Sequence, residues 1–466
     1  MKSLLRTKNI DSASYHNSNN HHNNNQSLKK SLGVFDLVMI GIGCTIGTGI
    51  FVVTGTAAAK YAGPAISLSY IIAAICCLFA ALAYAEMASM VPVSGSAYTY
   101  SYVVIGEFVA WLVGWGLVLE YGIGAATVAS GWSGYMVGIL KSANIIIPEK
   151  LTKSPFEDGI INLPAFLISF FIGILLYRGT KESVNLNRAL VAIKLIMIFI
   201  FLIIATPMIK FENYNNFMPF GFSNVLVGAA AIFYAYIGFD AVATTAEESK
   251  NPKRDLPIGI IISLGVCAIL YASVAIVLTG ISHYSTLNNP EPLARALREN
   301  NNNIGSALVA TGAIAGITSV LLVLIYGQSR IFMAMSRDGL VPKKLSVTHK
   351  KFNTPHISII FTTLIVSIIS AFFPLEALSH MTSIGTLFGF IVVAFAVLIL
   401  RIKKPELKRG FKCPAVYIIC PLAIISCSYL MFELLVKNIT YFSVYVIIGL
   451  IIYFGYGIKN SNLNKK

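Results

Sequence analysis

The feature that most constrains this chain is a glycine-rich stretch inside an apolar segment near its start. Residues 41–51 contain four glycines within nine residues, in an apolar run that opens at Val34 and continues past Phe51. Each glycine weakens a helix by roughly 1 kcal/mol relative to alanine. In a bilayer, the backbone groups freed by a break find no water, so a break survives only where protein or a polar cavity surrounds it.

The composition places these apolar runs in a membrane. The chain has 466 residues, of which 56% are hydrophobic and 12% charged, whereas about a quarter of residues are charged in soluble domains. The apolar runs are too many and too long for buried core helices. The formal charge of +15 does not indicate nucleic acid, because Lys and Arg gather in alternate loops, as membrane topology requires. We therefore predict a polytopic membrane protein.

A second apolar segment is interrupted much later, at residues 234–240, which read Tyr-Ala-Tyr-Ile-Gly-Phe-Asp. Two interrupted helices at corresponding places in two halves of a chain indicate the binding site of a secondary transporter. We predict that the first helix is unwound at Gly47–Gly49 and the second at Tyr234–Ile237.

Twelve apolar spans follow a polar N-terminal region. Residues 1–30 are rich in Asn and His and are predicted to be a disordered cytoplasmic tail; metal binding by its histidines is an alternative supported by composition alone. The predicted spans are 34–58, 64–91, 99–139, 160–178, 188–209, 224–247, 256–281, 305–336, 355–373, 376–400, 413–436 and 440–458.

The spans divide into two units and a remainder. Residues 31–209 would hold helices 1–5, and residues 210–400 would hold helices 6–10. Because five spans is an odd number, the second unit begins on the opposite side of the membrane, which makes a five-plus-five inverted repeat. Helices 11 and 12 and the C-terminal tail, residues 401–466, fall outside it.

Charge in the loops predicts the orientation. One set of alternate loops carries most of the Lys and Arg; it comprises residues 2–30, 178–188, 250–254, 330–351, 401–412 and 459–466. The positive-inside rule therefore places both termini in the cytoplasm, which agrees with an even number of spans in a multi-pass protein of the cell membrane. The seven cysteines lie mostly in apolar runs and form no CxxC pair, so we expect no disulfide, metal site or cofactor.

Five stretches carry a resemblance to a known family. The chain resembles the amino acid–polyamine–organocation transporters, and more narrowly their cationic amino acid transporter branch with its bacterial permeases. The resemblance runs from about residue 31 to about residue 342 and implies an all-α, LeuT-like fold with alternating access. It does not name the substrate, because the branch includes carriers of neutral and of cationic amino acids. The stretches are GIGCTIGTGIF, AEMASMVPVSGSAYTYSY, WGLVLEYGIGAATVASGWSGY, FYAYIGFDAVATTAEESKNPKRDLPIGI and YGQSRIFMAMSRDGLVP.

The break in the first helix is predicted to bind a substrate carboxylate. Unpaired N–H groups at the start of its second half carry a partial positive charge that attracts an anion. Gly47, Thr48 and Gly49 would hold the carboxylate, Thr48 also through its hydroxyl, and Thr45 is assigned to the same site. The alternative is close helix packing through small residues; the resemblance favours binding.

The break in the sixth helix offers the complementary group. The carbonyls of Tyr234, Ala235 and Ile237 are candidates to accept the substrate ammonium, since the first half-helix ends there with a partial negative charge. Together the two breaks would recognise the ammonium and carboxylate that every α-amino acid carries.

Three further residues are assigned to the substrate side chain. The resemblance places Glu120 and Asp240 near the distal end of the pocket, where they could pair with a cationic side chain or stay neutral beside an apolar one. The alternatives are a buried hydrogen-bonded acid for Glu120 and a helix cap for Asp240. Ile317 is a candidate pocket floor, whose branched side chain would favour small or medium neutral substrates.

Lys194 lies within the fifth apolar span, and an ionisable residue there is a functional candidate. Its alternative is snorkelling, because Arg188 lies only about two turns away. By resemblance, a lysine here places its ammonium where sodium-coupled relatives bind sodium. A tethered cation cannot leave, so coupling would require it to lose and regain a proton, and burial favours the neutral form.

These observations predict a proton-coupled importer of L-amino acids whose partners are the amino acid, the proton and the bilayer; a small membrane subunit is left open. The alternatives are an amino acid exchanger without net proton movement and a sensor that binds without transporting. A channel would need a ring of like pore-lining residues, which the sequence does not show. The chain carries no HExxH, GxSxG or paired Asp signature of an intramembrane enzyme.

Overall fold

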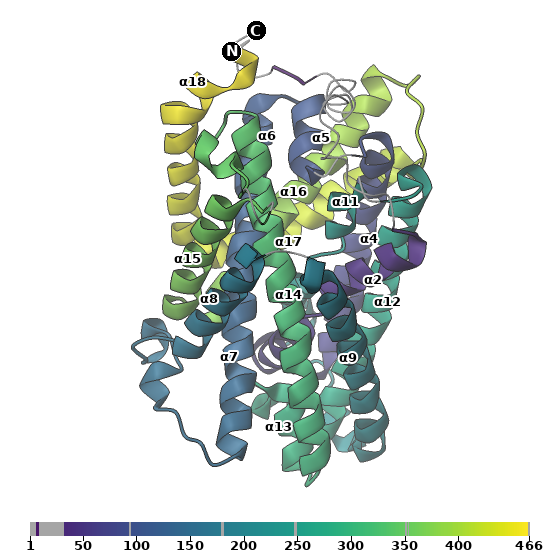
Figure 1. Cartoon of the computed structure of the whole chain (residues 1–466). Coiled ribbons are helices and arrows are strands. Elements are labelled where there is room, and N and C mark those ends of the chain that lie inside the picture. Colours follow the sequence, from purple (N-terminus) through teal and green to yellow (C-terminus); the bar gives the residue numbers. More distant parts are fainter. Residues whose placement is uncertain are drawn as a thin grey trace.

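The computed structural model describes residues 6–8, 32–92, 95–178, 181–246, 249–349, 352 and 354–464. Apart from residues 6–8, the predicted N-terminal tail lies outside this part. The described chain is helical, and its only extended pairing is one isolated bridge between Leu32 and Ser249. The predicted all-α class is therefore confirmed, and Figure 1 shows the helices gathered in one bundle, with the first and last described residues at the same end.

The helices are, in chain order, α2 (Val34–Thr45), α3 (Thr54–Ala57), α4 (Ile66–Met90), α5 (Ser96–Val104), α6 (Glu107–Val118), α7 (Gly124–Ser142), α8 (Leu163–Arg178), α9 (Lys181–Ala205), α10 (Phe222–Ile232), α11 (Ala241–Thr244), α12 (Pro252–Ile281), α13 (Pro292–Glu299), α14 (Asn303–Arg337), α15 (His356–Phe372), α16 (Leu375–Lys403), α17 (Val416–Ile452) and α18 (Ile458–Asn460). Single π-helical turns at Gly49–Val53 and Leu119–Ile123 connect helices to their neighbours.

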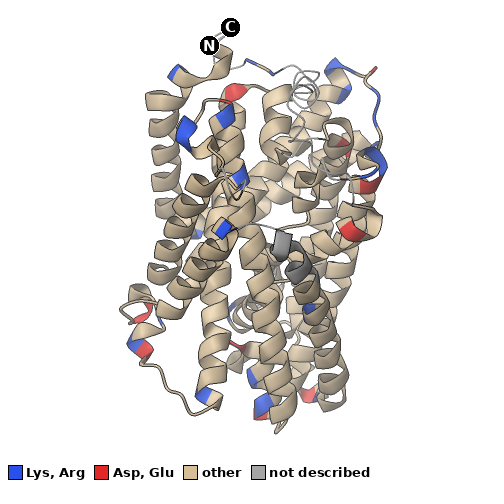
Figure 2. Ribbon diagram, in the orientation of Figure 1, with Lys and Arg blue, Asp and Glu red and all other residues tan. Residues whose placement is uncertain are grey.

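Eight helical segments of the described chain are long and apolar enough to cross a membrane, and α2, α8 and α15 are shorter apolar helices. This length and composition agree with a multi-pass membrane protein. Figure 2 shows that most charged residues lie toward the two ends of the bundle. The apolar windows of α9 and α17 are the least buried, at 28%, whereas that of the segment Phe222–Thr244 is 89% buried. The interrupted segment is thus enclosed by the other helices.

The third predicted span differs from the observed helices, whereas the last two predicted spans meet at an observed kink. The third predicted span, 99–139, is divided, because Gly106 adopts a φ of 134° that only glycine reaches easily and thereby separates α5 from α6. The last two predicted spans, 413–436 and 440–458, correspond to the two parts of α17, which are separated at Asn438, where the backbone is not helical, with a φ of −125° and a ψ of 22°. The predicted boundary between these two spans therefore coincides with the kink.

Candidate functional site

The first interrupted helix ends at Thr45 and resumes two residues later. Ile46 leaves the helical conformation with a ψ of 100°, whereas Thr48 is helical again and precedes the π-helical turn that begins at Gly49. The interruption is therefore Ile46–Gly47, and the prediction of Gly47–Gly49 extends too far. Thr48 and Gly49 instead belong to the first turn of the second half-helix, where backbone N–H groups have no partner within the helix.

The second interruption also lies later than predicted. Beyond α10, residues Phe233–Tyr236 form a 3₁₀ turn, and Ile237 then becomes extended with a ψ of 135°. Gly238 follows with a φ of 119°, and α11 begins only after Asp240. The predicted window of Tyr234–Ile237 is thus mostly helical, because the Ile237 N–H donates to the Tyr234 carbonyl across 3.3 Å and tightens the turn.

The two interruptions touch through glycines. A Cβ added to Gly49 would lie 2.4 Å from the Cα of Ala235, and one added to Gly238 would lie 2.8 Å from the backbone carbon of Cys44. Both distances are shorter than any real Cβ contact, so no other residue fits at either position. The glycines therefore let the two broken helices approach backbone to backbone.

A cavity lies where the two interruptions meet. Most of the predicted binding residues line it: Thr45, Gly47, Thr48, Gly49, Glu120, Tyr234 and Ile237. The residues that sequence reasoning missed are Cys44, Gly124, Val128, Val320, Leu324 and Thr382. Val128, Val320 and Leu324 make much of this wall apolar, and no sequence signal separates them from other apolar helix residues.

Three predicted residues do not line this cavity. Ala235 packs against Gly49 instead. Ile317 is buried in α14, and Val320 and Leu324, three and seven residues further along the same face of the helix, occupy the wall that it was expected to form. Asp240 lies beyond the second interruption and is discussed with Glu120 below.

Thr48 has the geometry of a ligand-binding side chain. It is 1% exposed, and its Oγ1 completes no hydrogen bond with any described residue, although the Tyr234 hydroxyl lies nearby. Gly131 of α7 makes room for its methyl group, because a Cβ there would come within 2.0 Å of the Thr48 Cγ2. A buried hydroxyl without a partner is costly, so Thr48 has hydrogen-bonding capacity to offer a polar ligand in the cavity.

Lys194 points from α9 into the first interruption. Its side chain is fully buried, and its Nζ donates to the carbonyl of Gly43, to that of Ile46 across 2.8 Å and to Ser319 Oγ across 3.3 Å. Three acceptors match the three N–H donors of a protonated lysine. The ammonium thus occupies the negatively polarised end of α2, and the snorkelling alternative is wrong, since the side chain is directed inward.

Glu120 and Asp240 face each other beside the cavity. Glu120 belongs to the π-helical turn Leu119–Ile123 and is 3% exposed. Asp240 is 1% exposed and occupies the N-cap position of α11 without a side-chain capping bond. Glu120, Tyr121 and the backbone of Gly238 lie near its carboxylate, but none completes a hydrogen bond of ordinary geometry with it. The capping alternative for Asp240 therefore has no bond to support it.

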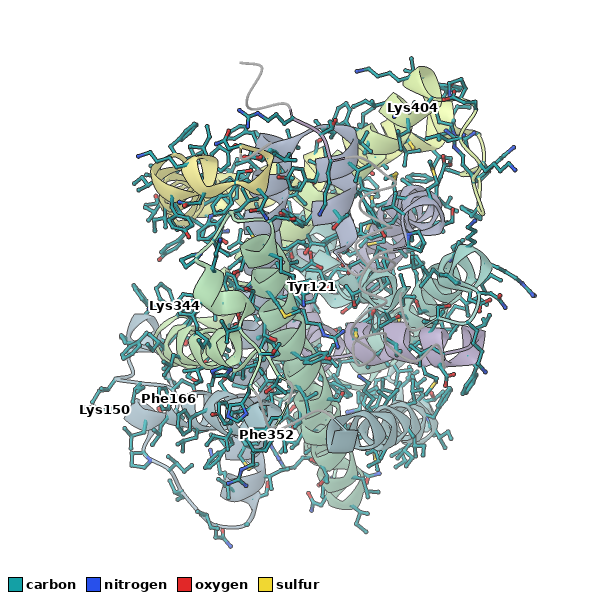
Figure 3. The ribbon with its side chains drawn as sticks, turned by 45° about the horizontal axis from the view of Figure 1, so that its top comes forward. Tyr121, Lys150, Phe166, Lys344, Phe352 and Lys404 are labelled. Atoms are coloured by element: carbon teal, nitrogen blue, oxygen red, sulfur yellow. The ribbon has the colours of Figure 1, made fainter. Side chains whose placement is uncertain are left out.

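A second cavity adjoins the first. It shares Cys44, Glu120, Ile237, Val320 and Leu324 with the first and adds Tyr121, Gly238, Ala241 and Val323. Figure 3 places Tyr121 in the interior of the bundle. Neither Tyr121 nor this extension was expected from the sequence. The described residues contain no cluster of three or more His, Cys, Asp or Glu able to hold a metal ion.

Comparison with known proteins gives consistent matches over the whole length. The amino acid permease family matches residues 32–455. The chain is 45% identical to the branched-chain amino acid permease BcaP of Bacillus subtilis over 445 residues, which cover 94% of this chain and 96% of the relative. It is 42% identical over 467 residues to the methylthioribose transporter of the same organism, with both chains fully covered. It is 36% identical over 414 residues to the vacuolar cationic amino acid transporter 4 of Arabidopsis thaliana, covering 87% of this chain and 68% of the relative.

Proposed function

This chain belongs to the amino acid permease family of the amino acid–polyamine–organocation superfamily, and from that premise we propose that it imports L-amino acids by alternating access coupled to protons. The observation that carries the proposal is the meeting of two interrupted helices at one cavity. The second half of the first helix offers N–H groups, and the end of α10 offers carbonyls. An α-amino acid presents the matching carboxylate and ammonium.

The lining supports a substrate with a neutral, apolar side chain. Beyond the two backbone sites, the wall consists of Val128, Val320 and Leu324, with Gly124 and Thr382 beside them. Burying aliphatic groups there is favourable at about 25 cal/mol per Å², whereas a cationic side chain would have Glu120 as its one acidic partner on this wall. The name of the BcaP relative, a branched-chain amino acid permease, agrees with this preference.

We assign proton coupling to Lys194. When protonated, it ties α9 to the carbonyl end of α2 through Gly43 and Ile46 and so favours one access state. Loss of the proton removes the charge that these carbonyls stabilise, and the contact is released. Because the lysine cannot dissociate, a proton takes the role that a free sodium ion would have.

The architecture that goes with this mechanism is a LeuT-like fold of twelve transmembrane helices in the cell membrane. Residues 31–209 and 210–400 would form the two inverted units, each beginning with an interrupted helix, and residues 401–466 would add the last two spans. Both termini would face the cytoplasm. The loop charges support this orientation.

Purified protein in proteoliposomes tests the function directly. Labelled leucine, alanine and arginine should be competed by a panel of unlabelled amino acids, and we expect leucine, isoleucine and valine to compete best. An inward pH gradient should drive accumulation above equilibrium. An exchanger would instead require amino acid inside the vesicle and ignore the gradient. Methylthioribose belongs in the panel because of the relative of that name; exclusive competition by it would refute amino acid transport.

A further inference from the structure

Two basic segments that are far apart in the sequence lie side by side at the end of the bundle that holds both chain ends. One comprises residues 249–256, at the start of α12, and the other comprises residues 401–417, which join α16 to α17. A Cβ added to Gly410 would lie 2.7 Å from the Cβ and from the carbonyl oxygen of Lys253. Figure 2 shows blue segments along the loop that follows α16. Together the two segments expose the cations that we call the basic surface: Lys250, Lys253, Arg254, Lys403, Lys404, Lys408 and Lys412.

The charge of the basic surface is not balanced by carboxylates of the described chain. None of its cations forms an ion pair with a described residue. Glu406 is the one exposed acid among the described residues of the two segments, since Asp255 is buried. The Glu86 carboxylate, which reaches the loop from α4, is already occupied by Arg401 and Arg409. The basic surface therefore attracts an anion from outside the chain.

The loop between α16 and α17 is held in one shape by its own hydrogen bonds. The Phe411 N–H donates to Ser89 Oγ of α4 across 3.1 Å. The buried Arg409 guanidinium donates at 2.7–3.1 Å to three carbonyls of the loop, those of Lys404, Pro405 and Leu407. An anion that binds here does not have to order the loop first, and such preorganisation favours binding.

The residues that flank the loop show the depth at which it lies. Ile402 near the end of α16 and Tyr417 near the start of α17 are 70% and 65% exposed, and both helices are long and apolar enough to cross a membrane. Exposed apolar side chains at these positions face lipid, and tyrosine is typical of the interface between hydrocarbon and water. Lysines beside them extend their apolar stems along this surface and place the ammonium among the headgroups.

We propose that the basic surface binds the phosphate headgroups of anionic phospholipids and that this binding holds the start of α12 beside the loop between α16 and α17. Without an anion, the cations of the two segments repel one another across their contact. Headgroup phosphates between the segments replace that repulsion with attraction. In the proposed orientation these lipids belong to the cytoplasmic leaflet. The inference does not depend on which substrate the protein carries.

A triple variant tests the surface on both segments at once: Lys253→Gln, Lys408→Gln and Lys412→Gln. Arg401 and Arg409 are kept, because they pair with Glu86. Full-length protein in detergent is titrated with phosphatidylglycerol and, separately, with phosphatidylcholine. Native mass spectrometry measures the affinity for the first lipid bound, and thermal unfolding measures the stabilisation that each lipid gives.

The matched control removes the same charge from segments that are also predicted to face the cytoplasm, and Figure 3 shows that one of its residues, Lys344, lies on the opposite side of the bundle from Lys404. It combines three exposed positions: Lys343→Gln, Lys344→Gln and Lys459→Gln. The control therefore separates this surface from the general attraction of a basic protein to anionic lipid.

We expect the wild type and the control to bind phosphatidylglycerol at least about tenfold more tightly than phosphatidylcholine, and the test variant to lose at least about fivefold of that preference. Phosphatidylglycerol should raise the melting temperature of the wild type and of the control but not of the test variant, because only a ligand of the folded state stabilises it. High salt should weaken the binding to the wild type, since exposed charges are screened.

Three results would overturn the proposal. Equal losses in the two triple variants would show that net charge, and not this surface, attracts the lipid. A wild type that binds both lipids equally would have no site for an anionic headgroup. Full displacement of phosphatidylglycerol by an equal concentration of inorganic phosphate would show that the surface binds free phosphate instead of a lipid.

Discussion

The Lys194 side chain is fixed by contacts with two other helices. It joins α9 to the end of α2 and to Ser319 of α14, and Gly316 lies so close that a Cβ there would be 2.9 Å from the lysine Cβ. A sodium ion about 4 Å from its ammonium would be repelled by several kcal/mol at an effective dielectric near 20. The same position therefore cannot hold a charged lysine and a sodium ion.

Lys194→Ala should abolish accumulation driven by a pH gradient and leave part of the substrate binding, because the backbone groups at the two interruptions remain. Lys141→Ala, at the exposed end of α7, is the control and should accumulate normally. Uptake into proteoliposomes under an imposed pH gradient, with and without sodium, measures both. Full proton-driven accumulation by the Lys194 variant, or an absolute sodium requirement in the wild type, would contradict the assignment.

Glu120→Gln should lower leucine uptake by less than about threefold, because an amide and a protonated acid make similar hydrogen bonds. Arginine uptake, if any is present, should fall far more, since the amide cannot balance a guanidinium. Glu433→Gln on α17 serves as the control for a change of one charge. An equal loss of leucine and arginine uptake would indicate that Glu120 has a structural role and does not contact the substrate side chain.

The sequence identified single residues best where their chemistry is unusual for their surroundings. An ammonium inside an apolar span stands out, so Lys194 could be found. Its partner Ser319 could not, because small polar residues are common in helices and the contact joins residues 125 positions apart. Tyr121 was missed because aromatic residues are common in apolar helices. Only the assembled bundle shows that Tyr121 lines the second cavity.

At the scale of elements, the glycines predicted that both helices are interrupted, but not at which residues each interruption begins and ends. A glycine allows a helix to break, but contacts with other elements determine at which residue it breaks. Here the decisive contacts are Gly49 with Ala235 and Gly238 with Cys44. The contact with Cys44 requires a residue without a side chain at position 238, where Gly238 has a φ of 119°. The preceding residues Phe233–Tyr236 form a 3₁₀ turn.

Gly49→Ala should prevent the two interrupted helices from meeting, because its Cβ would lie 2.4 Å from the Ala235 Cα, a backbone atom that cannot move aside. We expect leucine binding to fall by at least about tenfold and the melting temperature to drop. Gly265→Ala is the control: nothing lies within 4 Å of its added Cβ, and alanine favours helix by roughly 1 kcal/mol. Radioligand binding and thermal unfolding distinguish the two; equal behaviour would contradict the close approach.

Across the whole molecule, one buried ion cluster joins distant parts of the chain. The Glu86 carboxylate at the end of α4 accepts from Arg401 at 2.7 Å, from Arg409 at 3.0 Å and from the Cys413 N–H at 2.8 Å. Glu86 and the Arg409 side chain are almost fully buried, at 1% and 2% exposure. The cluster therefore fixes the segment between α16 and α17 against α4.

Glu86→Gln should destabilise the protein by about 3 kcal/mol or more, since it leaves two guanidinium groups without their carboxylate. Glu376→Gln breaks the Lys60 pair, whose side chains are 39% and 36% exposed, and should cost no more than about 1 kcal/mol. Thermal unfolding of the two variants in detergent gives the comparison. Similar melting temperatures would mean that the Glu86 cluster does not hold these elements together.

The membrane orientation was predicted from charge alone, and the native cysteines make it testable. All seven are buried, so a membrane-impermeant maleimide should label intact cells expressing the wild type only weakly. Lys150→Cys lies in the loop between α7 and α8, and Lys404→Cys lies just after α16; both positions are exposed, and Figure 3 shows both lysines at the periphery of the bundle. Because the loop charges place residue 150 outside and residue 404 in the cytoplasm, the first variant should be labelled in intact cells and the second only after permeabilisation. The reverse pattern would show that the protein has the opposite orientation in the membrane. Labelling of both from outside would contradict the positive-inside assignment and the odd number of spans predicted between residues 150 and 404.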